Sequence, residues 1–386
     1  MNTVRKGVVA LLVVGFLCLL NIGGTAQAVI GIPDDVPAST LLFPFFKTAT
    51  KPTATDRQDT LIVVTNTANL ATSLHVTIWT VNSKAVYGFN VTLGPKDVFS
   101  CSLLDLLIPA GITRPCGVIG DTPPAPSVLT ITVGNEQLLA GYVTADVVSG
   151  TTSLFPGQSG YPFREWNILI GHMYLVNLPK SFVTGINAVS LESVKPDAGK
   201  NAKAVTGQYQ GFYLTRCIEA GNSICDKRER IDGPNGDFAD TGTAGGLIGL
   251  SGDSPLSLII RRIAGGIFNT EVWLWKDRNT SGVSVNVVVY DEAENAFATT
   301  LPLQNEINVF TDASFGVPKS GWVRIRFTCA EFGSCGFNPA NPVDAQTVPI
   351  QSVAYALQSI RTPVAGDAAF PAHRYYSTYI GGLSEE

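Results

Sequence analysis

The sequence predicts an all-β protein in which two antiparallel β-sandwich domains follow one another and derive from an internal duplication. Three observations lead to this prediction: short runs rich in β-branched and aromatic residues, turn residues between these runs, and a similarity between the two halves of the chain. Such side chains favour strands, and clusters of Gly, Pro, Asn and Ser favour turns. A strand with alternating apolar residues can bury its apolar face only if a second sheet packs against it. The pattern therefore predicts β-sandwiches.

The chain begins with the features of a cleavable secretory signal peptide, residues 1–28. A basic N-terminal region precedes the apolar run Gly7–Leu20, and small residues follow up to Ala28. The run is too short for a membrane-spanning helix, which needs roughly 20 apolar residues. We therefore expect cleavage between Ala28 and Val29 and no membrane span afterwards. The expected location is extracellular, or else the periplasm or cell surface.

The charge and composition exclude several classes of protein. The net charge is −5, and removal of the signal peptide with its two basic residues leaves −7. No basic stretch remains that would attract nucleic acid, so no nucleic-acid partner is predicted. With 45% hydrophobic and 15% charged residues, the chain can bury a large core and is not a disordered tail.

The cysteines indicate disulfides, since an exported chain with an even number of cysteines usually pairs them. Six of the seven cysteines lie after the signal peptide. Six cysteines allow 15 pairings, and the hypothesis here is pairing between near neighbours. These neighbours are Cys101 with Cys116, Cys217 with Cys225, and Cys329 with Cys335.

A similarity between residues 59–80 and residues 270–291, at an offset of 211, is the basis for the predicted duplication. At this offset apolar positions match apolar positions, and Val76 matches Val287. If small shifts in offset are allowed, the similarity extends to four further pairs of segments: 39–46 with 256–263, 98–100 with 309–311, 128–133 with 322–327, and 140–147 with 352–359.

Within the first copy, the segment IVVTNTANLATSLHVTIW (62–79) resembles the strand, turn and strand of immunoglobulin-like modules on bacterial surface proteins. The resemblance implies architecture only, because the Cys, Trp and Cys framework of antibody domains is absent. The domain boundaries that we predict are a first β-sandwich over 29–180, a linker or insertion with a disulfide loop over 181–249, and a second β-sandwich with a C-terminal tail over 250–386.

The mature chain has three histidines, which is few for acid-base or metal chemistry. His75 alternates with apolar strand residues and is expected to be a half-exposed sheet residue. His172 lies in an apolar run, where we expect a structural histidine at a strand end; its alternative role is that of a catalytic base. His373 is expected in a solvated tail.

Two other groups of residues are candidate binding sites. The loop residues Asp232, Asn235, Asp237 and Asp240 offer oxygen atoms that suit calcium, but their spacing does not fit an EF-hand, and such residues are usual in turns. No metal site is therefore predicted, with calcium as the alternative. Trp273 and Trp275 share one face of a predicted strand, where core packing is favoured over a platform for sugars.

The predicted function is that of a secreted, non-catalytic extracellular protein with a structural, adhesive or ligand-binding role. Its partner would be an unknown extracellular protein or a glycan, and no cofactor motif is present. The alternative is a secreted hydrolase that uses His172 with a carboxylate brought near by the fold.

Overall fold

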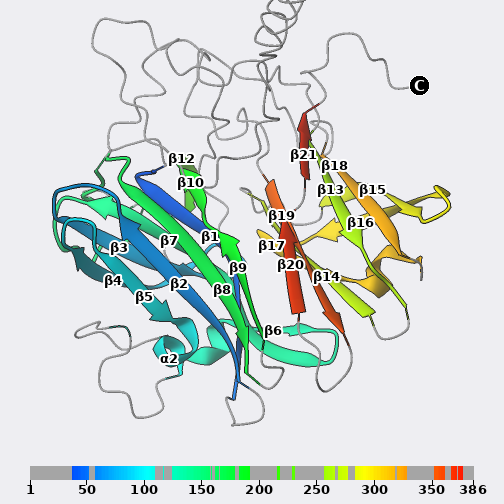
Figure 1. Cartoon of the computed structure of the whole chain (residues 1–386), viewed down its shortest axis with the longest axis horizontal. Coiled ribbons are helices and arrows are strands. Elements are labelled where there is room, and N and C mark those ends of the chain that lie inside the picture. Colours follow the sequence, from blue (N-terminus) through cyan, green and yellow to red (C-terminus); the bar gives the residue numbers. More distant parts are fainter. Residues whose placement is uncertain are drawn as a thin grey trace, which may run out of the picture. The chain divides into compact units, whose positions relative to one another are not determined.

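The computed structural model (Figure 1) describes residues 37–51, 57–108, 116, 124–156, 158, 161–164, 166–178, 182–191, 215–217, 228–230, 256–265, 268–276, 283–317, 320–327, 352–360, 367–371 and 373–376. These residues are mostly β-strands, and short helical segments such as α2 (Leu103–Leu107), η2 (Pro126–Val128) and η5 (Asp312–Phe315) connect some of them. The strand pairs of the described residues are antiparallel. The predicted all-β class is confirmed.

The strands of the first half of the chain form two sheets. Sheet 1 has the order β10-β1-β7-β3-β4, with β6 paired to β7, and sheet 2 has the order β5-β2-β8-β9. The strands are β1 (Thr40–Ala49), β2 (Gln58–Asn66), β3 (Thr72–Trp79), β4 (Ala85–Leu93), β5 (Val98–Ser102), β6 (Thr130–Val133), β7 (Glu136–Val148), β8 (Leu169–Asn177), β9 (Phe182–Asn187) and β10 (Val189–Leu191).

The second half also forms two sheets, and a separate pair joins β11 (Thr215–Cys217) to β12 (Arg228–Arg230). Sheet 3 has the order β17-β14-β19-β20, and sheet 4 has the order β16-β15-β18-β13-β21. Their strands are β13 (Leu256–Arg262), β14 (Phe268–Lys276), β15 (Val283–Asp291), β16 (Ala296–Leu303), β17 (Ile307–Thr311), β18 (Gly321–Phe327), β19 (Ser352–Ile360), β20 (Asp367–Pro371) and β21 (His373–Tyr376).

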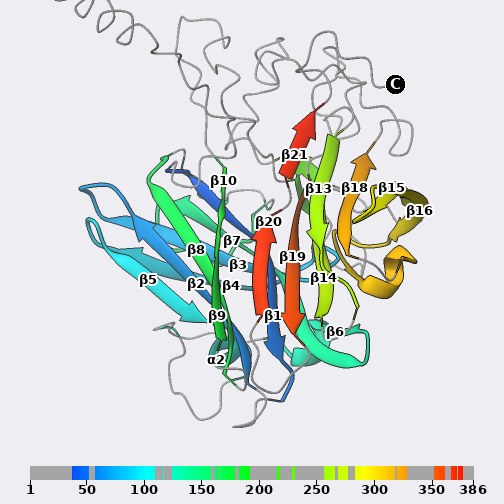
Figure 2. The ribbon, with the colours of Figure 1, turned by 45° about the vertical axis from the view of Figure 1, so that its right-hand side comes forward.

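The strand orders of the two halves correspond place by place. In sheet 4, β13, β18, β15 and β16 stand where β1, β7, β3 and β4 stand in sheet 1. In sheet 3, β17, β14, β19 and β20 stand where β5, β2, β8 and β9 stand in sheet 2. Figure 2 shows that the terminal strands β9 and β20 of sheets 2 and 3 lie next to each other.

Two of the sequence matches do not follow this strand order. Residues 128–133 were matched to 322–327, but β18 takes the place of β7 rather than that of β6. Residues 140–147 were matched to 352–359, but β19 takes the place of β8. The reason is that alternating strands share the same two-residue period, so pattern alone does not distinguish neighbouring strands.

Alternating side chains of β3 and β15 form the centre of each core. Leu74, Val76 and Ile78 are buried in the first half, and Val287 lies among buried apolar residues in the second. Sheets 1 and 2 approach closely at Gly171, where an added Cβ would lie 2.7 Å from Leu41. Among the described residues no helix is long and apolar enough to span a membrane.

Candidate functional site

The outer face of sheet 1, the face turned away from sheet 2, packs against sheet 3 through aromatic side chains. The ring of Phe45 stacks on Trp273 with centroids 5.1 Å apart and lies 5.6 Å from Tyr355. The ring of Tyr142 lies edge-on to Trp275 at 6.2 Å. Both tryptophans are 1% exposed, so this contact, called here the aromatic interface, joins the two halves through a buried surface.

The predicted burial of Trp273 and Trp275 is confirmed, but their surroundings differ from those expected. Val272 and Leu274, on the other face of β14, fill the core of the second half. The two tryptophans instead belong to the buried cluster of the first half. Because both rings are covered, they do not form an open platform for sugars.

Polar contacts accompany the aromatic interface at both ends. The ammonium of Lys47 lies 3.1 Å from Glu271 Oε2, and Trp273 Nε1 donates to the same oxygen at 3.2 Å. On the first half, the carbonyl of Val81 accepts the backbone N–H groups of Glu306 and Ile307 at 3.0 and 3.1 Å. Directional bonds at two places fix the orientation of the packed faces.

A cavity of about 200 Å³ lies beside the Lys47–Glu271 ion pair. Side chains from both halves line it, and most of them are polar. The lining residues are Lys47, Gln58, Asp59, Glu136, Leu175, Val176, Asn177, Asn269, Glu271, Leu357 and Ser359. Its volume is below the range of about 300–1,000 Å³ that drug-sized ligands require, so it suits one small polar group.

Two of the three carboxylates that line the cavity, those of Glu136 and Glu271, lie near the ammonium of Lys47. Its ammonium lies 3.1 Å from Glu271 and 4.0 Å from Glu136, and Gln58 donates to Glu136 at 2.6 Å. Carboxylates accept hydrogen bonds, the ammonium donates them, and the amides of Asn177 and Asn269 do both. The lining therefore complements a ligand with several hydroxyl or amide groups.

Sequence reasoning missed these cavity residues. Lys47 and Glu271 are 224 positions apart, and only the packing of β1 against β14 brings them together. One signal was available for Lys47: it is a single charge that follows the apolar run Leu41–Phe46 within one strand. Glu271 had no comparable signal in the sequence.

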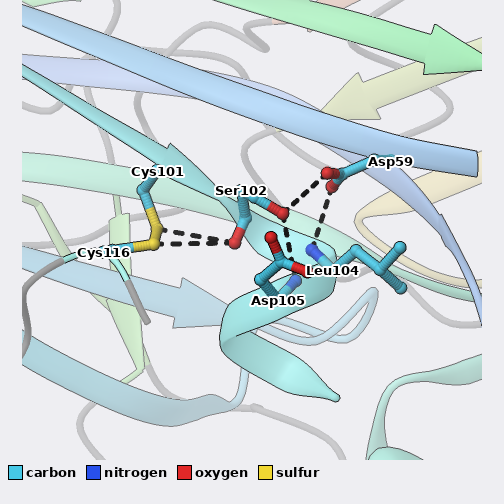
Figure 3. Close-up of a disulfide and its surroundings, with 6 residues drawn as sticks. All are labelled: Asp59, Cys101, Ser102, Leu104, Asp105 and Cys116. Atoms are coloured by element: carbon cyan, nitrogen blue, oxygen red, sulfur yellow. Dashed lines mark hydrogen bonds between the residues drawn. A yellow bond between two sulfur atoms is a disulfide. The ribbon is translucent and has the colours of Figure 1, made fainter. Parts of the chain in front are cut away.

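Asp59, drawn in Figure 3, is a buried residue whose carboxylate is part of the cavity lining. Its oxygens accept the hydroxyl of Ser102 at 2.6 Å and the backbone N–H of Leu104 at 2.9 Å. Ser102 in turn caps the short helix α2 by accepting the N–H of Asp105 at 3.0 Å. Burial raises the pKa of Asp59 above its ordinary value of 3.8, although these hydrogen bonds oppose the increase.

The raised pKa of Asp59 predicts the effect of an Asp59→Asn substitution on acid stability. The folded chain binds this proton more readily than the unfolded chain, so acidification from pH 7 towards 3.8 should stabilise the parent relative to the variant. Each pH unit between the two pKa values is worth about 1.4 kcal/mol. Urea unfolding at several pH values measures this difference. The exposed Asp97, replaced by Asn, is the control; equal pH dependence of all three proteins would contradict the prediction.

The structure contains the predicted disulfide between Cys101 and Cys116, which lies beside Ser102 (Figure 3). Cys217 lies in β11, but its side chain is outside the described residues. Cys225, Cys329 and Cys335 also lie outside them, so those two pairings stay predictions.

Neither His75 nor His172 is among the residues that line the cavity. The expectation of a half-exposed His75 is wrong, because this side chain is 1% exposed beneath a covering segment. His172 is partly exposed in β8, and its cross-strand neighbours are Val63 and Asn187, both uncharged. His373 is in strand β21, where its backbone pairs with Ile259, so the expectation of a tail at this position is wrong.

Two other predicted sites lie outside the described residues. They are the cleavage residues Ala28 and Val29, and the loop with Asp232, Asn235, Asp237 and Asp240. Within the part of the chain that the structure describes, no three His, Cys, Asp or Glu side chains cluster so as to hold a metal ion.

Comparisons with known proteins give little resemblance. No protein-family model and no curated protein matches the chain. The crystal structure of Thermotoga maritima 1070 aligns over 41% of this chain and 98% of its own, with 9% identity and a TM-score of 0.25. The exo-chitosanase CsxA of Amycolatopsis orientalis, in complex with PNP-beta-D-glucosamine, aligns over 85% of this chain and 26% of its own, with 10% identity and a TM-score of 0.11. At these scores neither similarity identifies a fold or a function for this chain.

Proposed function

We propose that this chain is an exported, non-catalytic binding protein made of two copies of one immunoglobulin-like β-sandwich module. The matching strand orders of the two halves support the duplication, because unrelated sheets would not be expected to repeat eight strand positions in the same order. Val76 and Val287 lie in corresponding strands, each second from the edge of its sheet and paired with β7 or β18.

The aromatic interface supports a fixed arrangement of the two modules. Buried aromatic rings contribute most of the energy of protein interfaces, and the bonds of Glu271 and Val81 add direction. Modules that only follow one another on a flexible linker do not need a fully buried pair of tryptophans. A fixed body with a cavity at the junction suits a binding role.

The ligand that we assign to the cavity is one sugar unit of an extracellular glycan. The observation that carries this assignment is the lining itself, in which both modules contribute carboxylate, ammonium and amide groups to one small space. Sugar hydroxyls both donate and accept hydrogen bonds, and such a lining offers partners of both kinds. Ligand sites are frequent at the junction of two domains.

A glycan-binding experiment tests the assignment. The exported chain, residues 29–386, is screened on immobilised glycans, and the best glycan is titrated against Asn177→Ala and Asn269→Ala variants. Each substitution removes hydrogen-bonding groups worth about 0.5–1.5 kcal/mol, so affinity should fall roughly threefold to tenfold. The exposed Gln304, which is not in the lining, supplies the control Gln304→Ala. Equal affinity of all variants would contradict the cavity as the glycan site.

A further inference from the structure

The imidazole of His75 lies on the outer face of sheet 1 beneath a segment that we call the strap, residues 149–156 and 161–164. Two aromatic rings of the strap contact it edge-on: Tyr161 at 5.7 Å and Phe155 at 6.5 Å between ring centroids. These rings leave His75 1% exposed, although it is on the face of β3 opposite the core.

Backbone and side-chain hydrogen bonds hold the strap on the sheet, and the backbone N–H of Arg164 donates to the carbonyl of Val147 in β7 at 2.8 Å. The side chain of Asn90 in β4 donates to the carbonyl of Thr152 at 2.8 Å and accepts the N–H of Thr152 at 3.0 Å. The hydroxyl of Tyr161 donates to Asp146 Oδ2 in β7 at 2.8 Å. A small apolar cluster formed by Val148, Tyr161 and Phe163 adds to these bonds.

The bonding of His75 leaves no place for a second proton. Its Nδ1 lies 3.2 Å from Asn90 Oδ1, an acceptor, so the proton of the neutral ring is on Nδ1. Its Nε2 is buried without a hydrogen-bond partner. This atom lies against the backbone of Gly88, where an added Cβ would be only 2.7 Å away. A protonated ring would therefore carry a buried N–H without an acceptor.

The groups that face His75 come from three elements. β7 supplies one charge, Asp146, whose oxygens also accept the hydroxyls of Thr40 at 2.6 Å and Tyr161 at 2.8 Å. β4 supplies the neutral Asn90, and the strap supplies the phenol of Tyr161. Burial lowers the pKa of His75, while the bond to Asn90 and the charge of Asp146 oppose this decrease.

We propose that this arrangement makes the strap an acid-sensitive latch, so that protonation of His75 lifts the strap from β3, β4 and β7 while the sheets stay folded. The open state exposes the imidazole, whose ordinary pKa is 6.5. Because the closed state has the lower pKa, acid favours the open state below about pH 6.5, and alkaline pH does not. Between the pKa of His75 in the open state and its pKa in the closed state, the equilibrium constant for opening rises up to about tenfold for each unit by which the pH falls.

Two measurements between pH 8 and pH 5 test the latch. The mature chain has only three histidines, so proton NMR of the imidazoles follows each of them once His75→Gln and His172→Gln spectra assign the signals. Amide hydrogen exchange, corrected for its intrinsic pH dependence, reports opening of the strap through the amides of residues 152–155, 161, 163 and 164. We expect protection of these amides to fall as the His75 signal titrates, below pH 6.5, while amides of β3 and β7 stay protected. The same loss should occur in His172→Gln and be absent in His75→Gln.

Loss of strap protection in His75→Gln with the same pH dependence as in the parent would overturn the proposal, as would a His75 signal that titrates only on global unfolding.

If His75→Gln does not fold, the Tyr161→Phe variant provides the test of the latch. Removing the phenol hydroxyl releases the bond between the strap and Asp146, which weakens the closed state, so less acid is needed to open the strap. Strap opening should then move to higher pH, and an unchanged midpoint would refute the latch.

Discussion

Replacing Trp273 with alanine is expected to lower the free energy of unfolding by about 3–5 kcal/mol, the usual cost of removing a buried tryptophan. The substitution removes the ring that stacks on Phe45 and the indole N–H that donates to Glu271. Since Trp273 lies between the two halves, we also expect the halves to unfold in separate transitions, whereas the parent unfolds in one.

Urea unfolding followed by circular dichroism measures both effects. The matched control is Phe297→Ala, because Phe297 is a large aromatic residue in the terminal strand β16 but is 41% exposed. A surface substitution of this kind usually changes stability by about 0.5 kcal/mol or less. If Trp273→Ala is no more destabilising than Phe297→Ala, the aromatic interface does not hold the halves together.

Replacing both Cys101 and Cys116 with serine is expected to cost about 3 kcal/mol. The two cysteines are 15 positions apart, and closing a loop of this length lowers the entropy of the unfolded chain by roughly that free energy. Cys101 also lies in β5, which leads directly into α2, so loss of the disulfide should loosen the segment that binds Asp59.

The measurement is again the urea midpoint, and peptide mapping without reduction gives the connectivity. The control is the Gln304→Ala variant, which is changed at an exposed site and keeps both cysteines. It should have the same urea midpoint as the parent. A peptide that links Cys101 to a cysteine other than Cys116 would contradict the account. So would a double serine variant as stable as the parent.

The sequence predicted well what depends on neighbouring residues. Alternation from Ser73 to Trp79 is a local property, and it correctly identified Leu74, Val76 and Ile78 as core residues. The segments matched around β2 and β14, and around β3 and β15, are also placed alike in the sheets, because each match rests on two adjacent strands and their turn.

The sequence did not predict which sheet faces are covered by other segments on the side turned away from the core of their own half. A two-residue period tells which side chains share a face, but it does not tell whether another sheet or a strap lies over that face. His75 and Trp273 are both on faces turned away from the core of their own half, and both are buried. Their coverings come from distant segments, the strap for His75 and β1 for Trp273.

The cavity was unpredictable for the same reason. It combines side chains of β1, β2, β7 and β8 with side chains of β14 and β19, and no motif spacing joins these strands. The charge of Lys47 within an apolar strand was the one local feature that pointed to a buried partner, since a charge in such a place needs an opposite charge nearby.

The central claim is that this protein binds an extracellular partner and catalyses no reaction. Its most direct test is a turnover assay of purified residues 29–386 and of the His172→Ala variant on panels of ester, peptide and glycoside substrates. We predict that neither protein exceeds the buffer rate on any panel. Turnover by the parent that disappears in His172→Ala would contradict the claim and make His172 a catalytic residue of a secreted hydrolase.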